Sequence, residues 1–153
     1  MKNVLTLGII QDKDAVLLGM KKRGFGKGKW NGLGGKCKAE ETVEQATERE
    51  IYEETMLKVK VTTNDKVGKI DFIYPDVTHE VHIYSLKNFS GSPVETEEIL
   101  PQWFSITKIP YDNMWEDDKY WLPILLEGKR FEGEFLFDEN IKLISHFLKV
   151  KHR

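Results

Sequence analysis

The chain has 153 residues, 31% of them charged and 40% hydrophobic, which is typical of a globular protein that buries one core as a single domain, 1–153. Its net charge of −2 and its pI near 6.1 argue against binding to a nucleic acid polymer, since such binding depends on clustered positive charge. The one cysteine, Cys37, excludes an internal disulfide and favours a reducing compartment.

Two apolar runs near the N-terminus, Val4–Ile10 and Ala15–Met20, predict paired strands because a short polar turn separates them. The first run is too short to span a bilayer, and no small-residue cleavage pattern follows it. We therefore expect neither a signal peptide nor attachment to a membrane. Thr6 in the first run is either an ordinary strand residue or a hydroxyl that points into a cleft.

A basic segment with alternating glycines, residues 21–29, leads into a short strand with a glycine turn, Trp30–Lys36. The segment has neither a G-x-G-x-x-G fingerprint nor the Gly-Lys-Ser/Thr end of a P-loop, so by itself it is either a flexible surface loop or a site loop. Its position directly before an acidic segment favours a site loop, because its cations would offset the negative charge of a triphosphate. The glycines of the turn let the backbone approach a metal ion or a phosphate closely.

The acidic segment, residues 40–54, holds seven glutamates and one arginine, a local charge of −6 in a chain whose net charge is −2. Thr42 and Gln45 have the spacing of a capping box, and the composition favours a helix. On that helix Glu50, Glu53 and Glu54 lie together, one turn apart, where like charges repel. One interpretation is a solvated acidic face. The other is a Mg²⁺ site, because a hard cation bound by carboxylates and phosphate removes the repulsion.

Alternating apolar residues predict further strands after this helix, at Val59–Val61, Val67–Ile73, Glu80–Leu86, Trp103–Ile106 and Arg130–Phe137. Asn140–Val150 has helical spacing instead and predicts an amphipathic closing helix, whose inward residues are Ile141, Ile144, Phe147 and Leu148. His79 and His82 do not share a strand face and have no third ligand, which indicates structural histidines and not a zinc site.

The segment Met114–Pro123 supports two interpretations. In the first, Asp117 or Asp118 caps a helix that buries Trp121 and the leucines after it. In the second, Trp115 stacks on a base and the two aspartates address the base edge. Adjacent carboxylates in a semi-apolar pocket keep one proton between them, so the pair would donate as well as accept hydrogen bonds. That would suit 8-oxoguanine, which carries a hydrogen on N7 where guanine has an acceptor.

The spacing of one motif resembles the Nudix box, which is long and rarely arises by chance: Gly35, Glu41, Arg49-Glu50-Ile51-Tyr52-Glu53-Glu54 and Leu57. One position departs from it, since Met56 stands where the motif has a glycine. A glycine there adopts a left-handed conformation at no steric cost, whereas methionine would be destabilised by about 1–2 kcal/mol. We therefore expect the helix to end in a different conformation, with the glutamates upstream unaffected.

Beyond the box, the chain resembles the animal oxidised-purine nucleoside triphosphatases of the Nudix family, relatives of bacterial MutT, over nearly its whole length. Residues 17–26, 30–32, 91–95, 114–115, 117–118 and 120–121 carry this resemblance. It implies an α+β fold, the Nudix α/β/α sandwich, with a mixed central sheet and the box helix packed on it. It also implies hydrolysis of nucleotides such as 8-oxo-dGTP and 2-hydroxy-dATP to the monophosphate and pyrophosphate.

Residue by residue, the resemblance implies a Mg²⁺ site, with Mn²⁺ as the alternative, formed by the Gly34 carbonyl and the carboxylates of Glu50, Glu53, Glu54 and Glu98. It implies substrate contacts, to the base, sugar and phosphates, from Thr6, Lys21, Phe25, Asn31, Leu33, Gly34, Gly35, Lys36, Phe72, Trp115, Glu116, Asp117 and Asp118. His79 and Ile99 stand where the mammalian enzyme has methionines and Glu116 where it has proline, which affects the expected base preference and not the reaction.

We expect Mg²⁺ to bridge phosphate oxygens while a water positioned by a box glutamate attacks phosphorus in line. Glu54 or Glu98 is the general base, and Arg49 holds the glutamates in register through ion pairs. Two alternatives stay open, a Nudix hydrolase of another nucleoside diphosphate derivative and a silent nucleotide-binding module. The expected partner is a small-molecule nucleotide, and the expected state is a cytoplasmic monomer, with mitochondrial or nuclear fractions left open.

Overall fold

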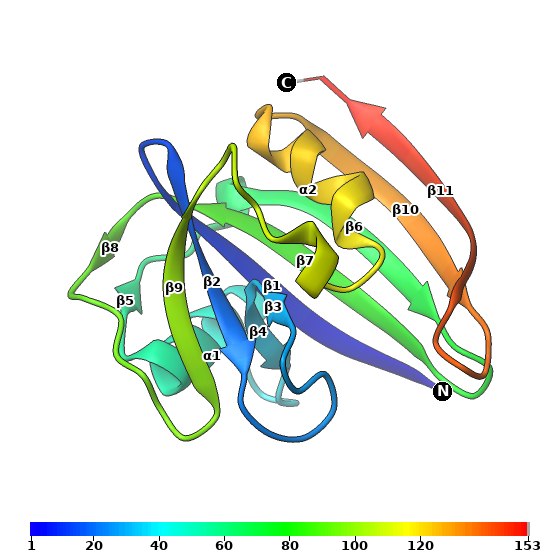
Figure 1. Cartoon of the computed structure of the whole chain (residues 1–153), viewed down its shortest axis with the longest axis horizontal. Helices are drawn as coiled ribbons and strands as arrows, with labels where there is room; N and C mark the ends of the chain where they lie inside the picture. Colours follow the sequence, from blue (N-terminus) through cyan, green and yellow to red (C-terminus); the bar gives the residue numbers. More distant parts are fainter. Residues whose placement is uncertain (153) are drawn as a thin grey trace.

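The computed structural model describes residues 1–152, which form one large mixed sheet with a helix on each face (Figure 1). In this range the large sheet contains Lys2–Asp12 (β1), Ala15–Lys21 (β2), Trp30–Asn31 (β3), Leu33–Lys36 (β4), Lys66–Ile73 (β6), Thr78–Leu86 (β7), Ile99–Ser105 (β9), Arg130–Phe137 (β10) and Leu143–Lys151 (β11). The other elements are Val43–Thr55 (α1), Asp118–Leu126 (α2), a small sheet of Lys58–Val59 (β5) and Phe89–Ser90 (β8), and the 3₁₀ turns Thr63–Asp65 (η1) and Tyr111–Asn113 (η2).

The strands of the large sheet follow the order β11-β10-β6-β7-β1-β2-β3, with β4 paired to β1 and β9 paired to β2. The pairs β1–β7 and β6–β10 are parallel and the other pairs are antiparallel, which confirms the mixed sheet. The N-terminal hairpin is also confirmed, since Ile10 of β1 lies opposite Leu17 of β2. No helix of residues 1–152 is long and apolar enough to cross a membrane.

The two helices cover opposite faces of the sheet, which confirms the predicted sandwich. Neighbouring residues of β1 point to opposite faces of the sheet, because side chains alternate along a strand. Ile9 packs in one buried cluster with Trp121 and Leu125 of α2, whereas Ile10 packs in the other with Ile51 of α1. Burial of each such side chain stabilises the fold by about 1.5–3 kcal/mol. Helix α1, which carries the box glutamates, is therefore held firmly against β1.

The start of helix α1 is capped as predicted, but the conformation at its end differs from the prediction. Its capping box is present, since Thr42 Oγ1 accepts from the Gln45 N–H at 3.0 Å and Gln45 Oε1 accepts from the Thr42 N–H at 2.9 Å. The expectation for its end is wrong: Met56 is left-handed, with φ 64° and ψ 11°, and its N–H donates to the Tyr52 carbonyl at 2.8 Å. The next residue, Leu57, is fully buried in the core, and this anchor keeps the chain in the sharp exit despite the strain on methionine.

Replacement of Met56 by glycine is expected to raise the free energy of unfolding by roughly 0.5–1 kcal/mol, because glycine relieves the left-handed strain but gains freedom in the unfolded chain. Little packing is lost, since the Met56 side chain is half exposed. Urea denaturation measures the difference. Met56→Ala is the matched control because it shortens the side chain and keeps the strain, and a glycine variant no more stable than the alanine variant would contradict the prediction.

The last element is a strand and not the predicted helix. β11 pairs antiparallel with β10 and forms the outer strand of the sheet, drawn in red in Figure 1. Ile144 and Phe147, expected to face inward, are 60% and 63% exposed. Asp138 Oδ1 accepts from the N–H groups of Asn140 and Lys142 and closes the turn that returns the chain along β10. The edge of β10 decides this outcome, since its backbone groups obtain hydrogen bonds from a strand and not from a helix.

Candidate active site

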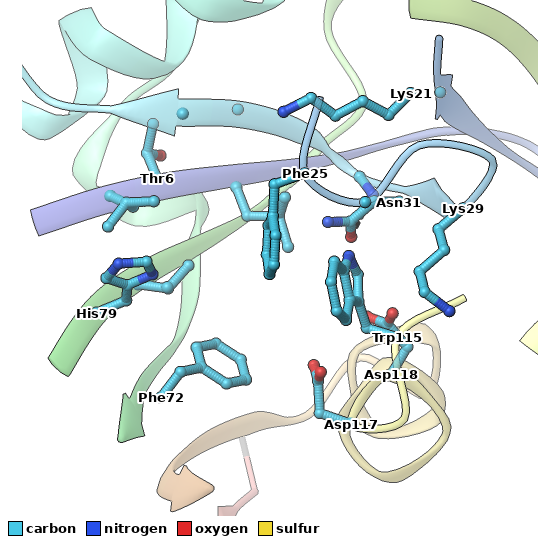
Figure 2. Close-up of a pocket in the computed structure, with 18 of the residues that line it drawn as sticks. Thr6, Lys21, Phe25, Lys29, Asn31, Phe72, His79, Trp115, Asp117 and Asp118 are labelled. Carbon is cyan, nitrogen blue, oxygen red and sulfur yellow. Dashed lines mark hydrogen bonds between the residues drawn. The ribbon is translucent and has the colours of Figure 1, made fainter. Parts of the chain in front are cut away.

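A cavity of about 280 Å³ opens between the inner strands of the sheet, the glycine-rich segment 21–29 and the start of α2 (Figure 2). This volume is close to the lower end of ligand pockets, roughly 300 Å³. The predicted site residues that line it are Thr6, Lys21, Phe25, Asn31, Gly34, Gly35, Glu54, Phe72, Trp115, Asp117 and Asp118. They come from distant parts of the chain, so folding is what brings them together.

Other residues predicted to contact substrate do not line this cavity. Leu33 is fully buried in the core beside α1, and Lys36 is exposed at the end of β4. Glu116 is engaged elsewhere, because its Oε1 accepts from the Leu143 N–H at 3.0 Å and so joins the loop before α2 to β11. The structure gives Glu116 a contact within the fold, which the resemblance did not foresee.

The two aspartates at one end of the cavity are buried, with Asp117 7% and Asp118 2% exposed. Asp117 Oδ2 accepts from Trp121 Nε1 at 2.8 Å, whereas Asp118 Oδ2 has no hydrogen-bond partner among the residues described. Burial raises the pKa of Asp117 to about 6. Burial and the neighbouring charge of Asp117 raise the pKa of Asp118 well above its usual range. The pair therefore holds a proton at neutral pH and can donate as well as accept.

The capping interpretation of this segment is half confirmed. Helix α2 starts at Asp118 and buries Trp121, Leu122 and Leu125, as expected. The Asp117 side chain, however, makes no capping hydrogen bond, and its carboxylate turns to the indole of Trp121 instead. The aspartates are thus available to a ligand, and the helix does not depend on them for its cap.

The raised pKa values of the pair predict a stability that depends on pH. The folded protein retains protons that the unfolded chain releases near pH 3.8, so this stabilising contribution is complete below 3.8 and is lost as the pH rises through the pKa of Asp117 at about 6. The double variant Asp117→Asn with Asp118→Asn lacks both groups and should gain stability relative to the unmodified protein as the pH rises from about 4 to about 7. Thermal unfolding of both proteins over this range tests it, and parallel profiles would contradict it.

Aromatic side chains form the wall beside the aspartates. The rings of Phe25 and Trp115 stack with centroids 5.1 Å apart and planes at 27°, and Lys29 Nζ lies 5.3 Å from the centroid of Trp115. Asn31 Oδ1 accepts from the Gly32 N–H at 2.8 Å, which leaves its amide hydrogens for a ligand. Figure 2 shows these side chains grouped on the side of the cavity where the aspartates lie. Flat faces and edge-directed polar groups together suit a heteroaromatic base.

Sequence reasoning missed Lys29 and Tyr74 and interpreted His79 as a structural histidine, whereas all three line the cavity. Tyr74 shares the strand alternation of Phe72, and that spacing was the available signal. Burial raises the pKa of Tyr74 to about 12 and lowers the pKa of His79, so both side chains are neutral at neutral pH. His79 lines the cavity, whereas His82 Nε2 is bonded to Glu80 Oε2 at 2.8 Å, in line with their predicted separation onto two faces.

Glu54 is the box glutamate that reaches the cavity. Its Oε1 accepts from the Gly34 N–H at 3.0 Å, and the Glu50 carboxylate lies against Gly35, where an added Cβ would be 2.6 Å from Glu50 Oε2. Burial, reinforced by the charge of Glu50, raises the pKa of Glu54 to about 8. Gly34 and Gly35 therefore allow the carboxylates of Glu54 and Glu50 to approach the same turn of the backbone. The repulsion between these two carboxylates favours the binding of a cation between them.

Arg49 binds three glutamates, which agrees with the predicted ion pairs. Its guanidinium donates to both carboxylate oxygens of Glu41, at 2.7 and 3.0 Å, and to one oxygen each of Glu50 and Glu53, both at 2.9 Å. It also donates to the Lys36 carbonyl at 3.1 Å. Charge-assisted bonds of this kind are shorter and stronger than neutral ones, so Arg49 fixes α1 relative to the end of β4.

Among residues 1–152, no three acidic, histidine or cysteine side chains already converge on one point as a metal-binding group. Of the four predicted carboxylate ligands, Glu50 and Glu54 meet at the glycine turn. Glu53 is held by the box arginine, and Glu98 is 59% exposed and lies 3.6 Å from Arg23 Nη2. The donor set fits a hard divalent cation nevertheless, because carboxylate and carbonyl oxygens are its preferred ligands and the charges of Glu50 and Glu98 both oppose ionisation of Glu54.

Comparison with known proteins agrees with this geometry. The NUDIX domain profile matches residues 1–125. The chain is 48% identical to the oxidized purine nucleoside triphosphate hydrolase of Danio rerio over 147 residues, 95% of this chain and 93% of that protein. It is 45% identical to the Mus musculus hydrolase of the same name over 147 residues, 94% of this chain and 92% of that protein. The crystal structure of a MutT protein from Bacillus halodurans superposes with a TM-score of 0.85 at 25% identity, covering 96% of this chain and 97% of that one. A family match across most of the chain, on a fold that places the box helix against a glycine turn, shows that this protein belongs to the Nudix hydrolase family.

Proposed function

We propose that this protein hydrolyses oxidised purine nucleoside triphosphates, such as 8-oxo-dGTP and 2-hydroxy-dATP, to the monophosphate and pyrophosphate. Damaged precursors would thereby leave the nucleotide pool before a polymerase uses them. The observation that carries the proposal is the buried pair Asp117 and Asp118, which holds a proton at neutral pH at one end of an aromatic cavity. The two oxidized purine nucleoside triphosphate hydrolases, which align over nearly the whole chain, support the same substrate class.

The pair would recognise the oxidised base at its altered edge. In 8-oxoguanine N7 carries a hydrogen, whereas in guanine N7 is an acceptor. A carboxylate of the pair accepts that hydrogen, and the protonated partner donates to the neighbouring carbonyl oxygen. Undamaged guanine would instead bring a lone pair against the carboxylate and leave a buried acceptor unsatisfied, at a cost of about 1–3 kcal/mol. Trp115, Phe25 and Phe72 would contact the flat faces of the base, and Asn31 its edge.

Nudix hydrolases generally need a divalent metal ion, and we propose Mg²⁺ here, with Mn²⁺ as a substitute. The ligands would be the Gly34 carbonyl and the carboxylates of Glu50, Glu53, Glu54 and Glu98. When bound, such an ion neutralises phosphate charge and orients the phosphate oxygens. To bind the metal, Glu53 would have to leave its ion pair with Arg49. The Glu53 side chain is free to turn because the residue is exposed on the outer face of α1.

Glu54 is the general base in this proposal. It lines the cavity, and its bond from the Gly34 N–H fixes one carboxylate oxygen, which leaves the second for the proton of the attacking water. Glu98, the other candidate, is exposed and lies beside Arg23. Arg49 positions the box glutamates and is not expected to touch substrate. Lys21 would contact the phosphates and Thr6 the sugar.

We further propose that residues 1–153 form one Nudix domain that acts as a monomer in the cytoplasm on a small-molecule nucleotide. The family profile covers most of the chain, and both helices pack on one sheet. The lone Cys37 is compatible with a reducing compartment.

A comparison of kcat/KM for 8-oxo-dGTP and dGTP, measured by pyrophosphate release with Mg²⁺, tests the proposed function. The unsatisfied acceptor predicts a preference for 8-oxo-dGTP of about 5- to 150-fold. Equal values would rule out a sanitising role. Dinucleoside polyphosphates and capped nucleotides in the same panel test the alternative substrate class, and binding without pyrophosphate release would indicate a silent module.

A further inference from the structure

The ammonium group of Lys29 lies at the aspartate end of the cavity, over the indole that forms its wall. Lys29 lines the cavity, and its Nζ is 5.3 Å from the centroid of the Trp115 ring. Figure 2 shows the lysine beside Trp115, on the side where Asp118 lies. Asp118 Oδ2 is buried without a hydrogen-bond partner among residues 1–152. A cation and an unpartnered carboxyl oxygen therefore share one end of the cavity.

The backbone of the glycine-rich segment fixes this position of the lysine. The Lys29 N–H donates to the Gly26 carbonyl at 3.0 Å, and the Lys29 carbonyl accepts from the Lys21 N–H at 3.2 Å. Gly26 lies so close to the indole that an added Cβ would be 3.0 Å from Cζ2 of Trp115. The turn packs against the indole, so the Lys29 side chain lies over the ring, an arrangement that attracts a cation.

The cations around the site differ in what they act on. Those near the aspartates in sequence or in space are engaged elsewhere: Lys22 with Glu95 at 2.5 Å, Arg23 with Glu98 at 3.6 Å, Lys21 through its charge on Glu54, and Lys119 over the ring of Tyr120 at 5.3 Å. Lys29 is the cation whose charge acts on Asp118.

The other titratable groups that face the aspartates are acidic or neutral: Glu116 from the loop before α2, Tyr74 after β6 and Tyr111 from η2. Burial raises the pKa of both tyrosines, so neither carries a charge at neutral pH. Burial and the charge of Asp117 raise the pKa of Asp118, and the charge of Lys29 opposes this rise. Lys29 thus supplies the positive charge that offsets the negative charge of the pair.

We infer that Lys29 is a specificity-determining residue, whose ammonium group stabilises the single negative charge of the Asp117–Asp118 pair and so favours bases that donate a hydrogen. A pair with one proton offers a carboxylate that accepts. A doubly protonated pair lacks this carboxylate and no longer excludes the lone pair on N7 of guanine. The inference rests on the proposed function, which assigns the pair to the altered edge of the base. It adds that the choice between oxidised and undamaged guanine depends on a lysine outside the pair.

The test measures the ratio of kcat/KM for 8-oxo-dGTP to kcat/KM for dGTP between pH 5 and pH 8. This ratio cancels the titration of groups that act on both nucleotides alike, such as Glu54. In the unmodified protein the ratio should fall as the pH drops through the pKa of Asp117 at about 6, because the pair takes up its second proton.

The variant Lys29→Met keeps the length of the side chain and loses its charge. The pH midpoint of the ratio should rise by about half a unit to one unit, because the charged pair is less stable without the cation. The ratio at pH 6 should then be about two- to fivefold lower than in the unmodified protein, and the two proteins should agree at pH 8.

Two further variants separate charge from packing. Lys29→Arg retains a cation over Trp115 and should keep the unmodified midpoint. Lys27→Met is the matched control, because it makes the same change at an exposed lysine of the same segment that does not line the cavity. It should also keep the midpoint. The inference is overturned if the midpoint is unchanged in Lys29→Met, or if it rises equally in Lys27→Met or Lys29→Arg.

Failure of the proposed function looks different, since the unmodified protein would then show no preference for 8-oxo-dGTP at any pH. In that event an NMR titration of the aspartate carboxyl carbons, in the unliganded Lys29→Met and unmodified proteins, decides the inference. A higher titration midpoint for the pair in the variant supports it, and superimposed titration curves overturn it.

Discussion

Substitution of Glu54 by glutamine is expected to lower kcat for 8-oxo-dGTP on the order of 10³-fold, within the range for loss of a general base. Glutamine keeps an oxygen that accepts from the Gly34 N–H, a contact that is 3.0 Å long in the structure. It also resembles the protonated carboxyl that the raised pKa of Glu54, about 8, favours in the absence of a cation. The fold should therefore persist while proton transfer and one metal ligand are lost.

The control for this substitution is Glu40→Gln, which makes the same chemical change at an exposed glutamate just before α1. This variant should keep kcat within about twofold of the unmodified protein, because the charge of an exposed glutamate outside the cavity is screened by solvent and salt. Steady-state kinetics at saturating Mg²⁺, with circular dichroism as a check on folding, measures both variants. A Glu54→Gln enzyme that keeps more than a tenth of the activity would remove Glu54 as the base and favour Glu98.

Replacement of Asp118 by asparagine is expected to reduce the preference for 8-oxo-dGTP over dGTP by about tenfold, because a buried hydrogen bond to a charged or proton-sharing group is lost. Asp118 Oδ2 is buried without a partner among residues 1–152, so within the cavity it is a carboxyl atom that a ligand can satisfy. An asparagine cannot exchange a proton with Asp117, and the pair loses its ability to adapt to the base edge. Asp117→Asn should have a similar effect, although its carbonyl can still accept from Trp121.

The matched control for the pair is Asp112→Asn, at an exposed aspartate in the turn η2 before α2. Its ratio of kcat/KM values for the two nucleotides should equal that of the unmodified protein. If Asp117→Asn and Asp118→Asn both kept the unmodified ratio, recognition of the oxidised base would lie elsewhere in the cavity, with Asn31 as the next residue to replace.

Local spacing was sufficient for several elements, because their contacts join residues close together in the chain. The capping box of Thr42 and Gln45 spans three residues, and the β1–β2 hairpin closes over a short polar turn. The strand Arg130–Phe137 has the predicted bounds, since its alternation of buried and exposed residues is a property of the strand itself. The acidic segment belongs to the same class, because a helix places its glutamates on one face whatever surrounds it.

Residue type and spacing indicated Trp115, Asp117 and Asp118 as part of a base pocket. Most other members of the cavity were predicted through resemblance, and the structure adds residues to that set and removes others. Lys29 and Tyr74 line the cavity without having been singled out, and Glu116 is bonded to the backbone of β11 instead. No local pattern contains this information, because a cavity is the space left between elements and its lining depends on how they pack.

By itself the sequence determined the capped acidic helix, the hairpin that supports it, and the adjacent aspartates, all from spacings of a few residues. The tertiary structure alone decided that residues 143–151 form a strand, that Met56 accepts a left-handed conformation, and that the hydroxyls of Thr6 and Thr47 are hydrogen-bonded to each other. The reason is common to all three. A strand obtains its hydrogen bonds from a distant partner, a strained residue is held by the buried side chain beside it, and a hydroxyl donates to whichever acceptor the fold brings within reach.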